Sequence, residues 1–590
     1  MKKSMLTFLV AIALLLSLCA CGQNPAASAD ADSATAAEPS AVAPAQSPSE
    51  PNTEETHTAA VTAPTGTYNG LMDEGVEAYL GVRYAAPAEL FKAPQPVTTT
   101  SSDEISATAF GPSCLQPVDS AMEPSLYELS SDCLTLNIWT KDHETKGKPV
   151  MLFIHGGSFV SGGTNDATLY GDNFIRNLPD GEDAVMITIN HRLGILGQLD
   201  LSMLEGYTDE YADCNNLWIL DAIQALKWVN ENIDAFGGDP ANVTIFGQSS
   251  GGMLCYYLTT VAEARQYFQK VIVESGTPFF GLQDHESYQK NCAAIFETLG
   301  VSSVDELVAL TDEQIMEQMP FVTYVNATAA PRYIDGRVVP LTWWDDFQAG
   351  CAKDITLMIG ATNGEVDFNA FDAEKYPGMV SADVTLGKLV NHYAPAGTPV
   401  YGVLPTQDVI DSMMETMPDD PNTRAIQIYT YFTHEHSDRL ICDAQSQYAT
   451  VYNYSFDWLP DASAITENLQ GAIFTPTGRA PHCSELPLIF DTVEDGYTYL
   501  ARWWLGAKAD AVTDKYDADK IPEKLCEQMR MTWYTFAKTG DPNNETIPQW
   551  DAYTTESHET MAINTEWEAQ TNPLAEDHAL AAGIRPLNEK

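Results

Sequence analysis

Short runs of apolar residues alternate with longer amphipathic segments through the middle of the chain. The runs at 149–157, 184–190 and 242–247 are nearly continuous in hydrophobic residues and end at glycine or asparagine, which is typical of strands buried on both faces. Segment 217–233 has apolar residues at helical spacing and no breaker, and segment 250–260 continues the last strand as a second helix. This alternation predicts an α/β fold with a mostly parallel sheet covered by helices.

Two glycine-rich motifs follow predicted strands, at the edge where such folds bind ligands. The first is HGGSF at 155–159, and the second is GQSSG at 247–251. In a G-x-S-x-G motif between a strand and a helix, the serine sits on a tight turn that exposes its hydroxyl. Gly247 and Gly251 leave room for that turn, so Ser249 is the candidate nucleophile.

The N-terminus has the pattern of an export signal. Two lysines precede an apolar run at 6–18, which is too short for a comfortable membrane span. The run ends in L-C-A-C at 18–21, which resembles a bacterial lipobox. We therefore expect a lipoprotein signal peptide at 1–20, with Cys21 lipidated at the cell surface or facing the periplasm. The alternative is an ordinary secretory signal cut near Ala20, which also implies export.

The rest of the chain divides into three parts by composition. Residues 21–66 are rich in Ala, Ser, Pro, Thr and acidic residues and cannot bury a core, so we expect a disordered linker. Residues 67–575 are globular, without an internal repeat or a second linker, and predict a single catalytic domain. Residues 576–590 form a short C-terminal tail.

Charge excludes one class of partner. The formal net charge is −52, from 82 acidic and 30 basic residues. Such a surface repels phosphate backbones, so we expect no nucleic-acid binding. We interpret the charge as keeping an exported protein soluble.

Cysteine and histidine spacing gives no sign of a metal site. Nine cysteines follow the signal, and none forms a C-x-x-C pair, which weighs against a zinc ribbon. His434 and His436 form an H-x-H pair without a further ligand cluster, so we predict that both lie on the surface and that no metal is bound.

Longer motifs resemble those of the type-B carboxylesterase family, which includes cholinesterases and bacterial para-nitrobenzyl esterases. The segment 236–251 is similar to the family's serine signature, and 131–140 is similar to its second signature, with Ser131 in place of an acidic residue. Further similarities lie at 77–87, 190–197 and 536–543. The resemblance implies an α/β-hydrolase fold with a large, mostly parallel central sheet, hydrolysis of small-molecule carboxylic esters, and no cofactor.

The resemblance also implies an oxyanion hole. Acyl transfer places negative charge on the carbonyl oxygen, which preorganised backbone N–H groups must meet. In the family these groups correspond to Gly157, Ser158 and Ser250. His155 is expected to brace the loop rather than act as a base.

The other two triad residues lie in two motifs that differ in part from the family's pattern. In 359–368 the resemblance assigns the acid to Glu365, although Asn363 is displaced by one place and Asp367 is a rival. In 478–490 it assigns the general base to His482, followed by Cys483 where glycine is usual. The order serine, acid, histidine is that of α/β-hydrolases.

Several functions remain open on this reading. An amidase, a thioesterase or a carbohydrate-ester deacylase would use the same triad, and the neuroligins use the fold for adhesion without the serine. Choline esters are not expected, because the loop between Cys114 and Cys133 has Tyr127 but no tryptophan to bind a quaternary ammonium.

The resemblance implies one disulfide. The family closes a surface loop between its equivalents of Cys114 and Cys133, and both cysteines lie in matching contexts. Cys442 and Cys483 are a possible second pair, which would pin the loop that carries His482.

Overall fold

The fold is described from a computed structural model. It covers residues 59–116, 128–279, 282, 285–318, 333–365, 407–416, 421–461, 478–505, 515–522 and 524–582. The chain divides into two compact units, Met1–His57 and Thr58–Lys590, and all of these residues belong to the second. Among them, no helix combines the length and the apolarity needed to cross a membrane.

The domain extends beyond its predicted bounds of 67 and 575. Strand β1 (Ala60–Ala63) pairs with β2 (Gly66–Asn69) and buries Val61. At the other end, helix α17 (Ala575–Ala581) packs near α11 (Gln407–Thr416) and buries Ala581. Both extensions are stabilised by a few buried side chains in segments whose composition is otherwise polar.

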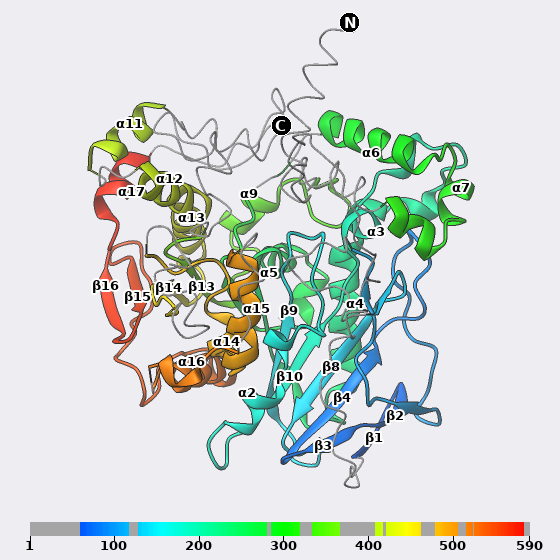
Figure 1. The fold of residues 1–590 in the computed structure, drawn as a ribbon, viewed down its shortest axis with the longest axis horizontal. Helices are drawn as coiled ribbons and strands as arrows, with labels where there is room; N and C mark the ends of the chain where they lie inside the picture. The colour runs from blue at the N-terminus through cyan, green and yellow to red at the C-terminus, as the bar shows by residue number, and fades with distance from the viewer. Residues whose placement is uncertain are drawn as a thin grey trace, which may run out of the picture. The chain divides into compact units, whose positions relative to one another are not determined.

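An 11-stranded sheet forms the centre of the domain (Figure 1). Its spatial order is β16-β15-β14-β13-β12-β11-β9-β10-β8-β4-β3. The strands are β3 (Leu71–Asp73), β4 (Val76–Arg83), β8 (Thr135–Thr140), β9 (Lys148–Ile154), β10 (Val185–Ile189), β11 (Gly238–Gln248), β12 (Lys270–Glu274), β13 (Thr356–Thr362), β14 (Val451–Phe456), β15 (Glu559–Ile563) and β16 (Glu568–Thr571). Pairing is parallel from β10 to β15 and antiparallel at both edges.

The three predicted strands lie at the parallel centre, as β9, β10 and β11. Along β9, Leu152 and Ile154 face one hydrophobic cluster while Met151 and Phe153 face the other. A strand with a core on each face needs apolar residues at every position, which explains the continuous runs. The hydrophobic pattern alone does not predict the antiparallel strands on either side of this centre.

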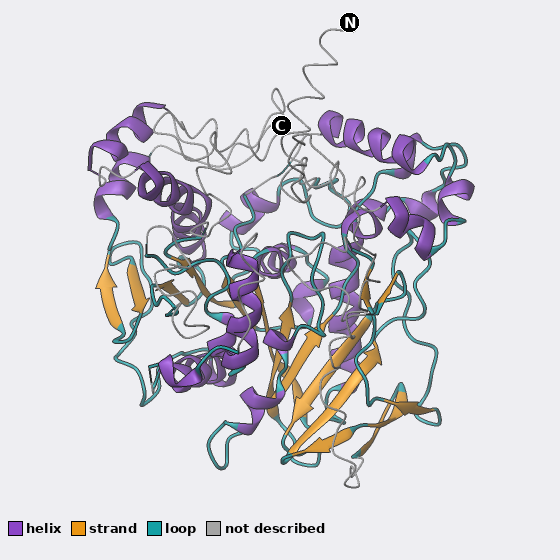
Figure 2. Ribbon diagram, viewed as in Figure 1, coloured by secondary structure: helices purple, strands orange, loops and turns teal. Residues whose placement is uncertain are grey.

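Helices cover both faces of the sheet (Figure 2). One cluster takes side chains from α4, α5, α6, α9 and α13, and the other takes them from α2, α14, α15 and α16. The bounds of these helices, with α3, α7 and α12, are α2 (Asp172–Arg176), α3 (Gly194–Gly197), α4 (Leu217–Asn232), α5 (Ser250–Thr260), α6 (His285–Leu299), α7 (Val304–Val308), α9 (Trp343–Gln348), α12 (Pro421–Thr430), α13 (His436–Gln445), α14 (Leu486–Ile489), α15 (Val493–Leu505) and α16 (Leu525–Thr539). The two predicted helices are α4 and α5, each within a residue of the expected bounds.

Candidate active site

The carboxyl ends of the central strands meet at one edge of the sheet. Ile154 of β9 lies beside Gly247 of β11, and Gln248 lies beside Glu274 of β12, which in turn pairs with Gly360 of β13. The residues that follow these strands are therefore brought together, as expected for a ligand site in an α/β sheet.

Ser249 occupies a sharp turn between β11 and α5. Its backbone has φ 58° and ψ −125°, and its N–H donates to the Glu274 carbonyl at 2.8 Å. The turn requires glycine at both flanking positions of the motif, as predicted. A Cβ atom on Gly251 would lie 2.0 Å from the Ile154 carbonyl oxygen, and a Cβ atom on Gly247 would lie 2.7 Å from the same oxygen. The motif therefore has the strained strand–turn–helix geometry that exposes a serine side chain.

The loop after β9 passes directly over this turn. A Cβ atom on Gly156 would lie 3.1 Å from Ser249 Cβ, and Gly157 and Ser158 follow with φ of 105° and 57°. The predicted donors are the backbone N–H groups of Gly157 and Ser158 in this loop and of Ser250 in the first turn of α5. These three predicted donors thus lie on two segments that are in contact beside Ser249.

Two side chains brace this loop. Gln116 accepts from the Gly162 N–H at 2.8 Å and donates to the Gly162 carbonyl at 2.8 Å. His155 is buried and stacks on His191 with ring centroids 4.6 Å apart. Burial lowers the pKa of His155 to about 3, so it is a neutral bracing residue rather than an available base. No motif indicates this role of Gln116, because its contacts span 46 residues.

Glu365 and His482 are in direct contact. His482 Nδ1 hydrogen-bonds Glu365 Oε2, and the other carboxylate oxygen accepts from the Thr362 N–H at 2.9 Å. The Glu365 side chain is 1% exposed and the His482 side chain 16% exposed. The structure therefore brings the predicted acid and base together, with the acid shielded from solvent.

Electrostatics favour a charged Glu365. Burial alone would raise the pKa of Glu365, but the imidazoles of His434 and His482 lower it to about 2. Burial opposes a charge on His482, whereas the neighbouring Cys483 sulfur and the Glu365 carboxylate raise the pKa of His482 well above its usual value. Burial raises the pKa of the Cys483 thiol, so the thiol is neutral near pH 7 and Glu365 supplies the negative charge beside His482.

Asn363 ties the acid loop to the base loop. Its side-chain oxygen accepts from the Ala480 N–H at 2.9 Å, and its carbonyl accepts from Arg479 Nη1 at 2.9 Å. One residue further, Gly364 pairs with Pro481 as an isolated β-bridge. The displaced asparagine of the sequence motif therefore has a structural role, which its spacing alone did not indicate.

Gln248 connects the serine turn to the base. Its Nε2 lies 3.1 Å from His482 Nε2, and its Oε1 accepts from the Cys483 thiol at 3.1 Å. Cys483 has φ 72°, a left-handed conformation in which glycine is usual. The residue that precedes Ser249 and the residue that follows His482 thus hold the imidazole between them.

The prediction that His434 and His436 lie on the surface is wrong. Both are buried, on a π-helical turn (Tyr431–Glu435) and at the start of α13. His434 Nε2 lies 3.8 Å from Glu365 Oε2, whereas His436 stacks on Tyr431. Residues two apart in a helix point in different directions, so the pair does not converge on one ion. Tertiary contacts such as that between His434 and Glu365 bury the pair, and the H-x-H spacing does not indicate them.

Cys114 and Cys133 are neighbours in the core. Both are buried free thiols, and the hydrogen bond with Cys114, together with burial, raises the pKa of Cys133 well above its usual value. The bridge between them stays a prediction. The possible second pair has less support, because Cys442 and Cys483 are free thiols that pack in opposite hydrophobic clusters.

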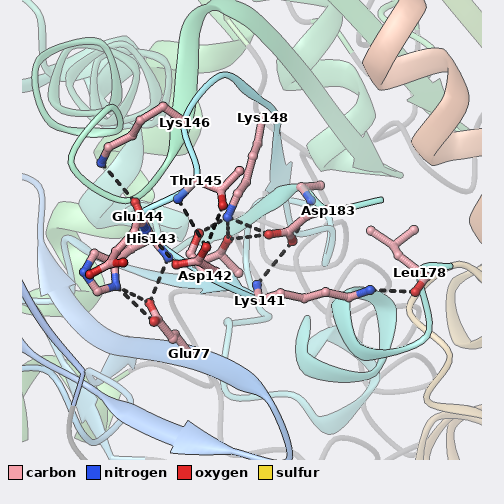
Figure 3. A network of polar contacts seen from close by, with 12 residues as sticks. Glu77, Lys141, Asp142, His143, Glu144, Thr145, Lys146, Lys148, Leu178 and Asp183 are labelled. Carbon is pink, nitrogen blue, oxygen red and sulfur yellow. Dashed lines mark hydrogen bonds and ion pairs between the residues drawn. The ribbon is translucent and has the colours of Figure 1, made fainter. Parts of the chain in front are cut away.

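One side-chain cluster away from this site has ligand-type atoms. Atoms of Glu77, Asp142 and His143 lie within 4.8 Å of one another. Figure 3 shows that protein donors already engage them: His143 Nδ1 contacts Glu77 at 2.8 Å, and Asp142 accepts from the Thr145 hydroxyl at 2.6 Å. We interpret the cluster as a brace at the ends of β4 and β8, and assign no metal to it.

Ala20, Cys21, Tyr127 and Asp367 lie outside the described residues, as do the predicted signal peptide and most of the predicted linker.

Known proteins resemble this chain along most of its length. The model of the carboxylesterase family matches residues 57–581. The para-nitrobenzyl esterase of Bacillus subtilis (strain 168) is 31% identical over 528 residues, which cover 88% of this chain and 97% of that protein. The phenmedipham hydrolase of Pseudarthrobacter oxydans is 27% identical over 548 residues, 87% of this chain and 97% of that protein.

The fold resembles that of solved esterases. The crystal structure of the Geobacillus stearothermophilus carboxylesterase EST55 at pH 6.2 aligns with a TM-score of 0.69 at 27% identity, over 88% of this chain and 99% of that one. This similarity agrees with the large, mostly parallel sheet and its flanking helices. The chain therefore belongs to the carboxylesterase family, has the α/β-hydrolase fold, and is a carboxylic ester hydrolase.

Proposed function

We propose that this hydrolase cleaves esters through an acyl-enzyme intermediate, with Ser249 as nucleophile, His482 as general base and Glu365 as the acid that orients the base. The observation that carries the proposal is the buried contact between Glu365 and His482 Nδ1, beside the residue that precedes Ser249. A carboxylate on Nδ1 fixes the tautomer in which Nε2 accepts a proton.

The first half of the reaction acylates the enzyme. His482 Nε2 takes the Ser249 proton as the serine oxygen attacks the ester carbonyl, and His482 then protonates the leaving alcohol. The backbone N–H groups of Gly157, Ser158 and Ser250 stabilise the oxyanion. Since Gln248 Nε2 lies 3.1 Å from His482 Nε2, Gln248 must give up this contact when Ser249 transfers its proton.

The second half releases the acid. Water attacks the acyl-enzyme carbonyl, His482 takes its proton, and Ser249 leaves with that proton returned. Glu365 stays ionised throughout and stabilises the imidazolium. No metal or organic cofactor enters either step.

The substrate is a small-molecule carboxylic ester. Similarity to a para-nitrobenzyl esterase makes aryl and benzyl esters of short acids the first substrates to test. The acyl and alcohol preferences of this chain follow only from such a panel.

Labelling and substitution test the nucleophile. A fluorophosphonate probe should label the wild-type protein on Ser249, as mapped by mass spectrometry, and Ser249→Ala should abolish labelling. Hydrolysis of p-nitrophenyl butyrate should fall by about 10⁵-fold in Ser249→Ala at unchanged melting temperature. A variant that keeps a tenth of the activity would exclude Ser249, and a wild type that neither labels nor hydrolyses would favour an adhesion protein.

We also propose export and anchoring through Cys21, supported by the basic start, the short apolar run and the L-C-A-C motif. The wild-type chain expressed in a bacterium should partition into the detergent phase with Triton X-114. Cys21→Ala should move it to the aqueous phase. Equal partition of the two proteins would contradict the anchor.

A further inference from the structure

The H-x-H histidine that the triad leaves unused lies against the triad acid. His434 Nε2 is 3.8 Å from Glu365 Oε2, the same oxygen that contacts His482 Nδ1. The two imidazole rings are 6.3 Å apart at an angle of 56°. One buried carboxylate is therefore flanked by two imidazoles.

The turn that carries His434 makes a second contact with the same residue. Thr430 Oγ1 accepts from the Glu365 N–H at 3.1 Å. Thr430 and His434 are four residues apart and lie on one face of the helix. The turn itself, Tyr431–Glu435, is π-helical, a conformation that occurs mostly as single turns and frequently at functional sites.

The His434 ring is held in place. Its Nδ1 lies 2.8 Å from Thr433 Oγ1, and its side chain is 10% exposed. Burial lowers the pKa of His434, so the ring is neutral near pH 7; it lies against the Glu365 carboxylate as a polar group and also hydrogen-bonds the Ser275 backbone. The titratable groups that face His434 from other elements are Glu365 and His482. The titratable groups that face His482 are Glu365, Cys483, Glu485 and His434.

We propose that His434 is a positioning residue: a second imidazole that shares the Glu365 carboxylate with His482 and limits how strongly the acid holds a proton on the base. This inference deepens the proposed function and rests on it. A carboxylate with two polar partners binds the His482 proton less tightly than a carboxylate with one. Removing His434 should therefore raise the pH at which His482 becomes a neutral base.

The variant His434→Phe tests the role by a pH profile. We measure kcat/KM for p-nitrophenyl acetate between pH 5.5 and 9.5. The acid limb should move to higher pH by about one unit, so that activity falls about 10-fold near pH 6 and less than about 3-fold above pH 9. A merely structural role would lower activity by the same factor at every pH.

Three further variants keep the test decisive. His434→Gln places an amide donor near the position of Nε2 and should restore most of the wild-type profile. If His434→Phe fails to fold, Thr433→Val, which removes the partner of Nδ1, should shift the limb in the same direction by a smaller amount. His436→Phe is the matched control, since the same exchange two residues away should leave the limb in place.

The results separate the two proposals. If the wild type and His434→Phe have superimposable acid limbs, the role of His434 alone is overturned. A limb that moves equally in His436→Phe also overturns it. A wild-type chain without ester hydrolysis overturns both proposals.

Discussion

The two halves of the site are built in different ways. The nucleophile half consists of the glycine-rich loop after β9 and the turn after β11, and its geometry comes from backbone conformation and the absence of Cβ atoms at Gly156 and Gly251. The acid–base half joins the Glu365 loop, the His482 loop and the π-helical turn through side-chain contacts such as Asn363 to Ala480.

This difference explains where the chain departs from its family's motifs. Backbone geometry tolerates few residue types, and the G-x-S-x-G pattern is intact. An assembly of side chains can reach one arrangement with different residues. Asn363, His434 and Cys483 all lie in the acid–base half. Asn363 is displaced relative to the family motif, Cys483 replaces its usual glycine, and His434 was predicted to lie on the surface.

Within the acid–base half, the largest expected effect is at the acid. Glu365→Gln should lower kcat for p-nitrophenyl esters by about 10³- to 10⁴-fold, because an amide cannot fix the imidazole tautomer or stabilise its charged form. Asp367→Asn is the matched control and should cost less than about 3-fold. The reverse ranking in initial-rate assays would assign the acid to Asp367.

A disulfide would add a covalent constraint to the nucleophile half. Cys114 lies two residues before Gln116, which braces the oxyanion loop. The Cys114 sulfur accepts from the Leu193 N–H at 3.2 Å. Non-reducing peptide mapping of the exported protein should give a linked Cys114–Cys133 peptide, and reduction should lower the free energy of unfolding by about 3 kcal/mol. A Cys114 that is alkylated without reduction would contradict this.

Two amide side chains offer a direct comparison of the halves. Gln116→Ala loosens the oxyanion loop, and Asn363→Ala loosens the acid loop. Each should lower kcat about 10-fold, the effect of losing about 1.4 kcal/mol of transition-state stabilisation. Only Asn363→Ala should also move the acid limb of the pH profile, because only that loop sets the environment of His482. Identical pH profiles for the two variants would remove the distinction.

The smallest effect concerns the wild-type pH profile. His482 must be neutral to accept the Ser249 proton, and its raised pKa places the acid limb of kcat/KM above pH 6.5, the value of an ordinary histidine. For stability the sign is opposite: the raised pKa of His482 stabilises the fold below pH 6.5, and this contribution is lost as the pH rises through the folded value. A limb below pH 6.5 would show that Glu365 does not act on His482 as proposed.

The sequence was most informative where structure is local. The three central strands, helices α4 and α5 and the turn at Ser249 follow from periodicity and glycine spacing within about fifteen residues. The antiparallel strand β8, which lies between β10 and β4, was not identified, because Asn137 and Thr135 interrupt its apolar pattern, although both are buried in the fold. Its burial depends on neighbours that pair from distant segments.

The resemblance to the family predicted the residues of the site but not the contacts between them. Glu365 and His482 were assigned from motifs, yet their contact depends on residues 117 positions apart. His434 and Gln116 could not be assigned, because a buried histidine or glutamine looks like any surface residue until its tertiary partners are known. Long-range side-chain contacts leave little trace in a single sequence.

The positive backbone angles of the site have an evolutionary consequence. Ser158, Phe159, Ser249 and Cys483 all have φ between 57° and 72°, a region that costs a non-glycine residue about 1–3 kcal/mol. Together these residues hold strain comparable to the net stability of an ordinary domain. Random mutation selected only for heat resistance would relax such positions early and yield a sturdier but inactive protein. Engineering this protein for heat resistance should therefore leave these four residues unchanged and place stabilising substitutions elsewhere in the fold.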